Sequence, residues 1–149
     1  MLSANCLCRQ AIAQADQRQA ALAFEQQGKT AEAEAAWKAI AAGAPNDAEA
    51  YAHLGLLEAR QEHFKEAIAD YRRALAIDPQ MQSVRINLGL ALFKSGELKE
   101  TVQIFEPMLK NMPDSAPQRM RLVALVGLAH YGLGNYAAAV PFLKEAVAA

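Results

Sequence analysis

The sequence predicts an all-α fold, a right-handed α-solenoid of about four helix–turn–helix repeats and therefore eight helices. Three series of residues recur at intervals of 34 positions and carry this prediction. They are the prolines Pro45, Pro79 and Pro113, the pairs Leu54-Gly55 and Leu88-Gly89, and the aromatic residues Trp37, Tyr71 and Phe105. A fixed period of this length indicates stacked helical hairpins, because each hairpin can bury its apolar face only against its neighbours.

Four units follow from this register, at residues 14–47, 48–81, 82–119 and 120–149, after an N-terminal extension at residues 1–13. The turns QQGKT, KSGEL and GLGNY carry a glycine where the first helix of a repeat is expected to end. Asp78-Pro79 and Pro113-Asp114 are expected to separate repeats, since proline lacks the N–H that would continue a helix. The small residues at Gly55, Gly89 and Gly127 are expected to let the two helices of a repeat approach closely.

The last unit is displaced by four residues, because Gly127 follows Gly89 by 38 positions whereas Pro113 keeps the interval of 34. Four residues make about one helical turn. We therefore expect the first helix of the last repeat to be one turn longer than the others. It would begin at Asp114 or Ser115, with Pro117 in its first turn.

Composition limits the classes of partner. The chain has 149 residues, 53% of them hydrophobic and only 7% aromatic, so it can form one domain whose core is built from many small contacts. With 15 basic and 16 acidic residues the formal net charge is −1, and no basic stripe of the kind that binds nucleic acid is present. No apolar run approaches the roughly 20 residues that span a bilayer, so we expect a soluble chain without a membrane span.

The repeat pattern resembles the tetratricopeptide repeat over about nine-tenths of the chain. That pattern has a large residue and Leu-Gly on the first helix, Ala and then an aromatic residue on the second, and Pro at the end. Residues 48–81 match it at Tyr51, Leu54, Gly55, Ala67, Tyr71, Ala74 and Pro79, and depart from it at Glu58. The resemblance implies a non-catalytic protein–protein interaction scaffold that binds a peptide or a helix in a concave groove lined by the first helices.

Mapped onto this sequence, the resemblance implies a groove that is largely apolar and carries isolated polar groups. Its candidate residues are Arg18, Leu22, His53, Leu56, Arg60, Ile86, Asn87, Leu90, Phe93, Arg121, Leu128 and Tyr131. A subset of the family binds the C-terminal peptides of chaperones through a clamp of basic and amide side chains. Only Asn87 and Arg121 match the clamp, while Ala52 and Leu56 stand at two other clamp positions.

One segment, HLGLLEARQEH at residues 53–63, carries two histidines and two glutamates and raises a remote alternative, a metal-assisted hydrolase. Helical rise would place His53 and His63 about 15 Å apart, whereas two imidazoles on one zinc ion lie within about 4 Å. No phosphate-binding loop, nucleophile elbow or H-E-x-x-H motif is present. We therefore expect no enzyme, no catalytic residues, no metal site and no cofactor, and we expect His130 to be a core histidine.

The two ends leave alternatives open. Cys6 and Cys8 are expected to be free thiols, and the small residues of AIAQADQ at 11–17 are similar to the end of an export signal, so either a cytoplasmic or an exported, periplasmic location fits. At the other end Phe142, Leu143, Ala146 and Val147 form an apolar helix face. Two interpretations follow, the N-terminal fragment of a longer repeat array or self-association through this uncapped helix. The identity of a protein or peptide partner is not encoded in the pattern.

Overall fold

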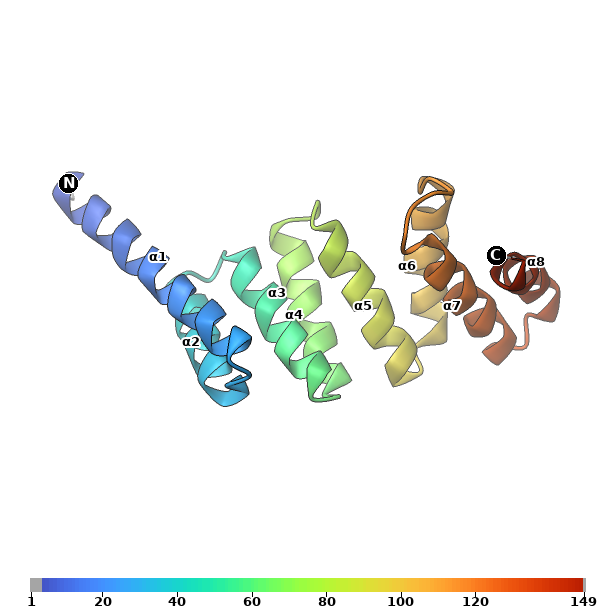
Figure 1. Cartoon of the computed structure of the whole chain (residues 1–149), viewed down its shortest axis with the longest axis horizontal. Coiled ribbons are helices and arrows are strands. Elements are labelled where there is room, and N and C mark those ends of the chain that lie inside the picture. The colour runs from blue at the N-terminus through green and yellow to red at the C-terminus, as the bar shows by residue number, and fades with distance from the viewer. Residues whose placement is uncertain (1–3, 149) are drawn as a thin grey trace. The chain divides into compact units, whose positions relative to one another are not determined.

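The computed structural model describes residues 4–148, with the backbone alone for residues 4–13. The described residues form eight helices and no strand, which confirms the predicted all-α fold (Figure 1). The helices are α1 (Ala4–Gln26), α2 (Thr30–Gly43), α3 (Ala48–Arg60), α4 (Phe64–Ile77), α5 (Gln82–Ser95), α6 (Leu98–Lys110), α7 (Arg119–Gly132) and α8 (Tyr136–Val147).

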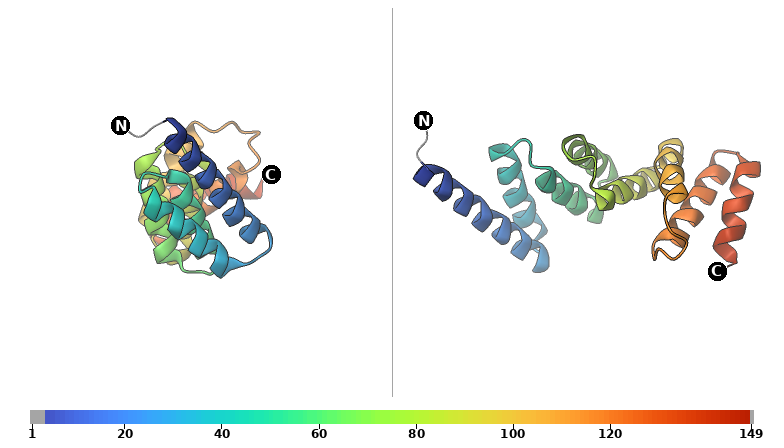
Figure 2. Two further views of the ribbon diagram at one scale, coloured as in Figure 1. Left: turned by 90° about the vertical axis from the view of Figure 1, so that its left-hand side faces the viewer. Right: turned by 90° about the horizontal axis from the view of Figure 1, so that it is seen from above.

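The chain divides into two compact units, residues 1–80 with α1 to α4 and residues 81–149 with α5 to α8. In the first unit α1 packs on α2, α2 on α3, and α3 on α4. In the second unit α5 packs on α6, α6 on α7, and α7 on α8 (Figure 2). Each unit therefore consists of two helical hairpins, and within each unit the second helix of the first hairpin contacts the first helix of the second hairpin.

The close approach expected at the repeat glycines is confirmed. A Cβ atom added to Gly55 would lie 2.7 Å from Cδ1 of Tyr71, and one added to Gly127 would lie 2.7 Å from Cδ2 of Leu143. At Gly89 it would overlap the ring of Phe105. Since Tyr71 and Phe105 are buried, their rings occupy the space that a side chain on the first helix would need.

Small side chains hold the equivalent place on the second helices. Ala33, Ala67 and Ala139 are buried there, and Thr101 takes the same position in the third repeat. A buried hydroxyl destabilises a fold unless it is hydrogen-bonded. Here Oγ1 of Thr101 donates to the carbonyl oxygen of Glu97 at 3.0 Å, one helical turn earlier, so the departure from alanine leaves no unsatisfied group.

The prediction of a longer first helix in the last repeat is wrong. α7 begins at Arg119 and has 14 residues, the same number as α5. The segment before it forms two successive turns instead, in which the N–H of Ala116 donates to Pro113 at 3.0 Å and the N–H of Arg119 donates to Ala116 at 2.9 Å. Pro117 disfavours the helical conformation at Ala116, so the four extra residues lengthen the loop.

The turn between α3 and α4 places a non-glycine residue in the left-handed region. Gly28, Gly96 and Gly134 have φ of 69°, 87° and 76° at the ends of α1, α5 and α7, and Glu62 takes the equivalent place with φ 63°. A Cβ atom makes this conformation unfavourable by roughly 1–2 kcal/mol. The sequence pattern did not reveal this position, because the turn QEH contains no glycine.

We therefore expect Glu62→Gly to raise the free energy of unfolding by about 1 kcal/mol, because glycine adopts positive φ without steric cost. Urea denaturation followed by circular dichroism measures the change. Glu66→Gly is the control, since it removes a glutamate from the first turn of α4, where glycine lowers helix stability. A loss of stability in Glu62→Gly would contradict this prediction.

Candidate interaction surfaces

Arg18, a predicted groove residue on α1, is engaged within the first unit. Its guanidinium pairs with the carboxylates of Asp47 and Glu49 at the start of α3. Asp47 is also the N-cap of α3, because its Oδ1 accepts the N–H of Ala50 at 3.2 Å. Arg18 therefore ties α1 to the beginning of the next repeat.

His53 belongs to a second polar cluster in the same unit, centred on Glu25. Oε1 of Glu25 accepts the indole N–H of Trp37 at 2.7 Å and lies 2.6 Å from Nδ1 of His53. The imidazole of His53 stacks on Trp37, with ring centroids 4.2 Å apart and planes 6° from parallel. Arg60 adds a positive charge 3.8 Å from Oε2 of Glu25. The cluster joins α1, α2 and α3 through one largely buried carboxylate.

The remaining predicted groove positions of the first unit differ in accessibility. Leu22 on α1 and Arg60 on α3 are exposed, whereas Leu56 is half-buried. The cluster around Glu25 was only partly visible in the sequence. The repeat pattern marks Trp37, but the pairing of an indole with a carboxylate twelve residues earlier has no local signal.

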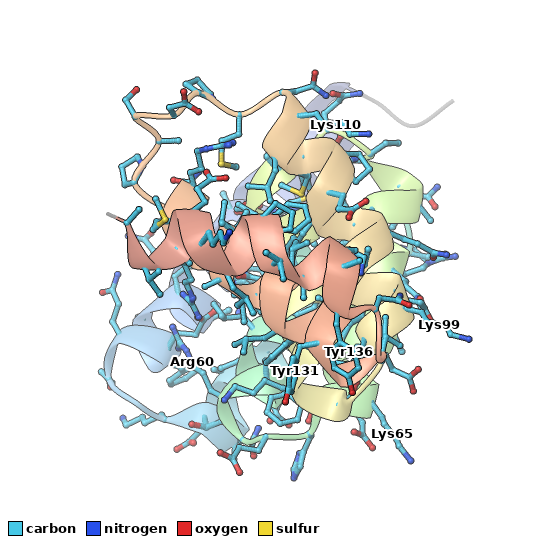
Figure 3. All side chains as sticks on the ribbon, turned by 90° about the vertical axis from the view of Figure 1, so that its right-hand side faces the viewer. Arg60, Lys65, Lys99, Lys110, Tyr131 and Tyr136 are labelled. Atoms are coloured by element: carbon cyan, nitrogen blue, oxygen red, sulfur yellow. The ribbon has the colours of Figure 1, made fainter. Side chains whose placement is uncertain are left out.

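In the second unit the predicted groove residues fall into two groups. Ile86 and Leu90 on α5 are partly buried and pack against the core cluster that includes Phe105 and Leu122. Asn87 and Phe93 are half-buried, while Arg121, Leu128 and Tyr131 on α7 are exposed. The ring of Tyr131 meets that of Tyr136 edge to face at 5.3 Å, and Figure 3 shows the two side chains next to each other. The exposed members therefore lie on α7.

The prediction that His130 is a core histidine is confirmed. His130 is buried, and its Nε2–H donates to Oε1 of Glu106 at 2.7 Å. Its ring also stacks on Phe142, with centroids 5.9 Å apart. These contacts join α7 to both α6 and α8 through one side chain.

Arg119 is a polar residue that the sequence reasoning missed. Its Nη1 donates to the carbonyl oxygens of Leu109 at 2.8 Å and Met112 at 3.3 Å, at the end of α6. Its Nη2 donates to Glu145 on α8 at 3.2 Å, and its Nε lies 3.1 Å from Asp114 in the preceding loop. Arg119 borders a hollow of about 250 Å³ between α6, α7 and α8, whose apolar wall is Leu109, Val123 and Phe142.

The histidines and glutamates of residues 53–63 do not come together. His53 contacts Glu25, while Nδ1 of His63 lies 2.9 Å from Oε2 of Glu58, and Glu62 is exposed in the turn. Within the described part of the chain, no three His, Cys, Asp or Glu side chains are grouped so that they could hold a metal ion. Among the same residues, no helix is long and apolar enough to cross a membrane.

Asp70 on α4 has an unusual electrostatic environment. Burial, together with the nearby carboxylate of Glu58, raises the pKa of Asp70 from 3.8 to about 6, although Lys38 opposes the shift. Because the folded state binds this proton more tightly than the unfolded chain, the free energy of unfolding falls as pH rises from about 4 to about 6. Above that range the ionised carboxylate remains a destabilising group.

We therefore expect Asp70→Asn to stabilise the fold by about 1 kcal/mol at pH 7.5 and to change little at pH 4. A shift of two units corresponds to nearly 3 kcal/mol, but the half-exposed carboxylate is screened by solvent, which lowers the expected gain. Urea denaturation at pH 7.5 and at pH 4 measures the change in the free energy of unfolding at each pH. Asp16→Asn, at an exposed residue of α1, is the matched control and should show no such pH-dependent difference. An equal gain at both pH values would contradict the electrostatic explanation.

Comparison with known proteins agrees with this architecture. MamA from Desulfovibrio magneticus RS-1 superposes with a TM-score of 0.79 at 22% identity, over 90% of this chain and 73% of that chain. An O-GlcNAc transferase mutant from Thermobaculum terrenum gives a TM-score of 0.66 at 25% identity, over 87% of this chain and 23% of that chain. These likenesses establish the fold.

Sequence comparison identifies the repeat. Bacteriophage adsorption protein A of Escherichia coli (strain K12) is 30% identical over 79 residues, which are 53% of this chain and 8% of that protein, so the chain spans less than a tenth of this relative. Three family models, each described as a tetratricopeptide repeat, match residues 18–82, 58–126 and 121–149. Together these matches run without a gap from residue 18 to residue 149, and the chain belongs to the tetratricopeptide repeat family.

Proposed function

We propose that the chain is a non-catalytic protein-interaction scaffold whose first helices bind a peptide or a helix of a partner protein. The observation that carries the proposal is that each unit exposes apolar and positively charged side chains on its first helices, Leu22 and Arg60 in the first unit and Arg121 and Tyr131 in the second. Exposed apolar side chains beside a few charged groups are typical of peptide-binding surfaces.

Three of the four polar residues that the sequence offered for catalysis, His53, Glu58 and His63, are engaged in contacts within the fold. His53 contacts Glu25 and stacks on Trp37, and His63 contacts Glu58. Contacts that fix a histidine within the fold favour a role in stability over one in chemistry. This supports a binding function for the chain.

The test uses a phage-displayed library of random 16-residue peptides selected on the full chain. The tightest peptide is synthesised with a fluorescent label, and its affinity is measured by anisotropy against Arg60→Glu, Arg121→Glu and Tyr131→Ala. We expect at least one of these variants to weaken binding about tenfold, as truncation of a principal contact does. Leu90 is unsuitable for such a test, because it packs on the core.

Lys65→Glu is the control, since Lys65 is an exposed residue of α4, a second helix of its repeat. It reverses one charge, as Arg60→Glu does, and should leave the affinity unchanged. Unchanged affinity in all three variants on the first helices would contradict the proposed groove.

Self-association is the competing interpretation, and the exposure of Val147 on α8 favours it. Sedimentation velocity over a hundredfold range of concentration distinguishes the two. A scaffold for other proteins keeps the mass of the single chain, whereas a self-associating module shows concentration-dependent oligomers without any peptide.

A further inference from the structure

In the second unit, α7 packs on the hairpin formed by α5 and α6. The equivalent apolar residues of the last hairpin, formed by α7 and α8, are exposed. Leu90 on α5 and Leu109 on α6 pack in the cluster that includes Leu122 of α7. Leu98, at the start of α6, lies against Gly132 at the end of α7, close enough to exclude a side chain there. The first helix of the last repeat therefore covers an apolar face of the preceding hairpin.

Equivalent residues of the third and fourth repeats are 38 positions apart. Leu90, Leu98 and Leu109 therefore correspond to Leu128, Tyr136 and Val147 on the last hairpin. We call these three residues the α7–α8 face. Leu128 is 48% exposed, Tyr136 61% and Val147 85%, whereas Leu109 is only 6% exposed. The α7–α8 face thus carries large apolar residues at the positions that are covered by α7 in the preceding hairpin, but no described residue covers it.

The helices that cover such faces share one pattern. α3 presents Ala50, Leu54 and Leu57 to a cluster that includes Ile40 and Ala41 of α2, and all five residues are buried. α7 carries Leu122, Val126 and Ala129 at the same repeat positions, and these are buried too. Ile40 and Ala41 correspond to Ala146 and Val147 on α8. A helix that fits the α7–α8 face therefore has small or branched apolar residues at positions i, i+4 and i+7.

The corresponding positions of α1 do not fit this pattern. Counting back 34 residues from α3 gives Asp16, Ala20 and Ala23, of which Asp16 and Ala20 are exposed. If α1 of a second copy covered the face, the carboxylate of Asp16 would take the place that the buried apolar residues Ala50 and Leu122 take on α3 and α7. This argues against head-to-tail stacking of two copies.

The charge around the α7–α8 face also distinguishes a second copy of the chain from an acidic helix as the occupant. Arg121 on α7 and Lys144 on α8 are exposed and form no ion pair among the described residues, whereas the nearby Glu145 is paired with Arg119. A symmetric pairing of two α7–α8 faces would bring these positive charges together. An acidic helix would instead complement them.

We propose that the α7–α8 face binds an acidic amphipathic helix of a partner protein, with apolar residues at i, i+4 and i+7. This surface shares Leu128 and Arg121 with the groove proposed above, but it extends onto α8, a second helix, through Tyr136 and Val147. The bound helix would take the place that α7 takes on the preceding hairpin.

The chain itself provides a probe with the required pattern. A synthetic peptide of residues 47–61, DAEAYAHLGLLEARQ, has the apolar residues of α3, three acidic residues and one basic residue. The matched control is residues 13–27, AQADQRQAALAFEQQ, which is the same part of the preceding repeat. Both are labelled with fluorescein and titrated with the full chain. We expect the first peptide to bind at least tenfold more tightly than the second.

Two variants locate the site. Tyr136→Asp and Val147→Asp should each weaken binding of the first peptide at least tenfold, and circular dichroism should show an unchanged helix content for Val147→Asp, since Val147 is exposed at the end of α8. Leu22→Asp places the same charge on an exposed apolar residue of α1 and should leave this affinity unchanged while testing the groove.

Three results would overturn the proposal. The first is no binding of the first peptide, and the second is binding that neither Tyr136→Asp nor Val147→Asp weakens. The third is a reversible dimer in sedimentation velocity that Val147→Asp abolishes, which would make a second copy the occupant. Loss of library-peptide binding in Arg60→Glu alone would concern the groove, because Arg60 lies on α3 in the first unit, so the two proposals can fail separately.

Discussion

Replacing Gly89 with alanine is expected to lower the free energy of unfolding by about 3 kcal/mol, the upper end of the usual range for overpacking. In an exposed helix the same substitution normally stabilises by about 1 kcal/mol. Here the sign reverses, because the added Cβ atom would overlap ring atoms Cε1 and Cζ of Phe105. Phe105 is fully buried, so its ring can move only by displacing the rest of the core.

Gly43→Ala is the matched control for this substitution. Gly43 is the last residue of α2, and nothing lies within 4 Å of the position that its Cβ would take. We expect Gly43→Ala to leave stability unchanged or to raise it by up to about 1 kcal/mol. Urea denaturation of both variants measures the difference. Equal effects in the two variants would mean that helix propensity, rather than contact with Phe105, determines the result at Gly89.

Replacing Arg119 with methionine is expected to lower the free energy of unfolding by about 3 kcal/mol. Methionine keeps the length and the apolar part of the side chain but removes the hydrogen bonds to Leu109, Met112 and Glu145. Hydrogen bonds from a charged donor contribute about 1.5–3 kcal/mol each, and some of this loss is recovered when water reaches the carbonyl groups. The end of α6, the loop before α7 and the last part of α8 therefore all lose a shared contact.

Two further variants isolate the geometry of Arg119. Arg121→Met removes an arginine from an exposed position of the same helix, and should change stability by less than about 0.5 kcal/mol. Arg119→Lys retains the charge but cannot donate to several acceptors at once in a fixed fork, so it should fall between the wild type and Arg119→Met. If Arg119→Lys were as stable as the wild type, charge alone would account for the contribution of Arg119.

Much of the fold could be predicted from the sequence because repeat packing depends on residue size at fixed spacing. Gly55 and Tyr71, or Gly89 and Phe105, are separated by the same 16 positions in two repeats, so one contact predicts the next. The loop before α7 could not be predicted as readily. A displacement of four residues fits either an added helical turn or a longer loop, and the conformational restriction at Ala116 before Pro117 decided between them.

The candidate site was less predictable than the fold. The groove positions were assigned by resemblance, and their side chains differ in availability. Arg18 pairs with Asp47, while Arg121 is exposed and forms no ion pair with any residue whose side chain the structure describes. Which arginine is paired depends on carboxylates that lie at the ends of other helices, such as Asp47 and Glu49 at the start of α3. Periodicity gives the position of a side chain on its helix but says nothing about the charge that stands opposite it.

The sequence by itself determined the number of hairpins, the small residues between their helices and the aromatic rings that pack there, because these follow from local periodicity and side-chain volume. Only the tertiary structure decided which polar residues were engaged. The contacts of Glu25 with Trp37 and His53, and of Arg119 with Leu109 and Glu145, join different helices, so no local pattern encodes them. The same is true of the α7–α8 face, whose apolar residues were visible in the sequence but whose exposure depends on what packs against them in space.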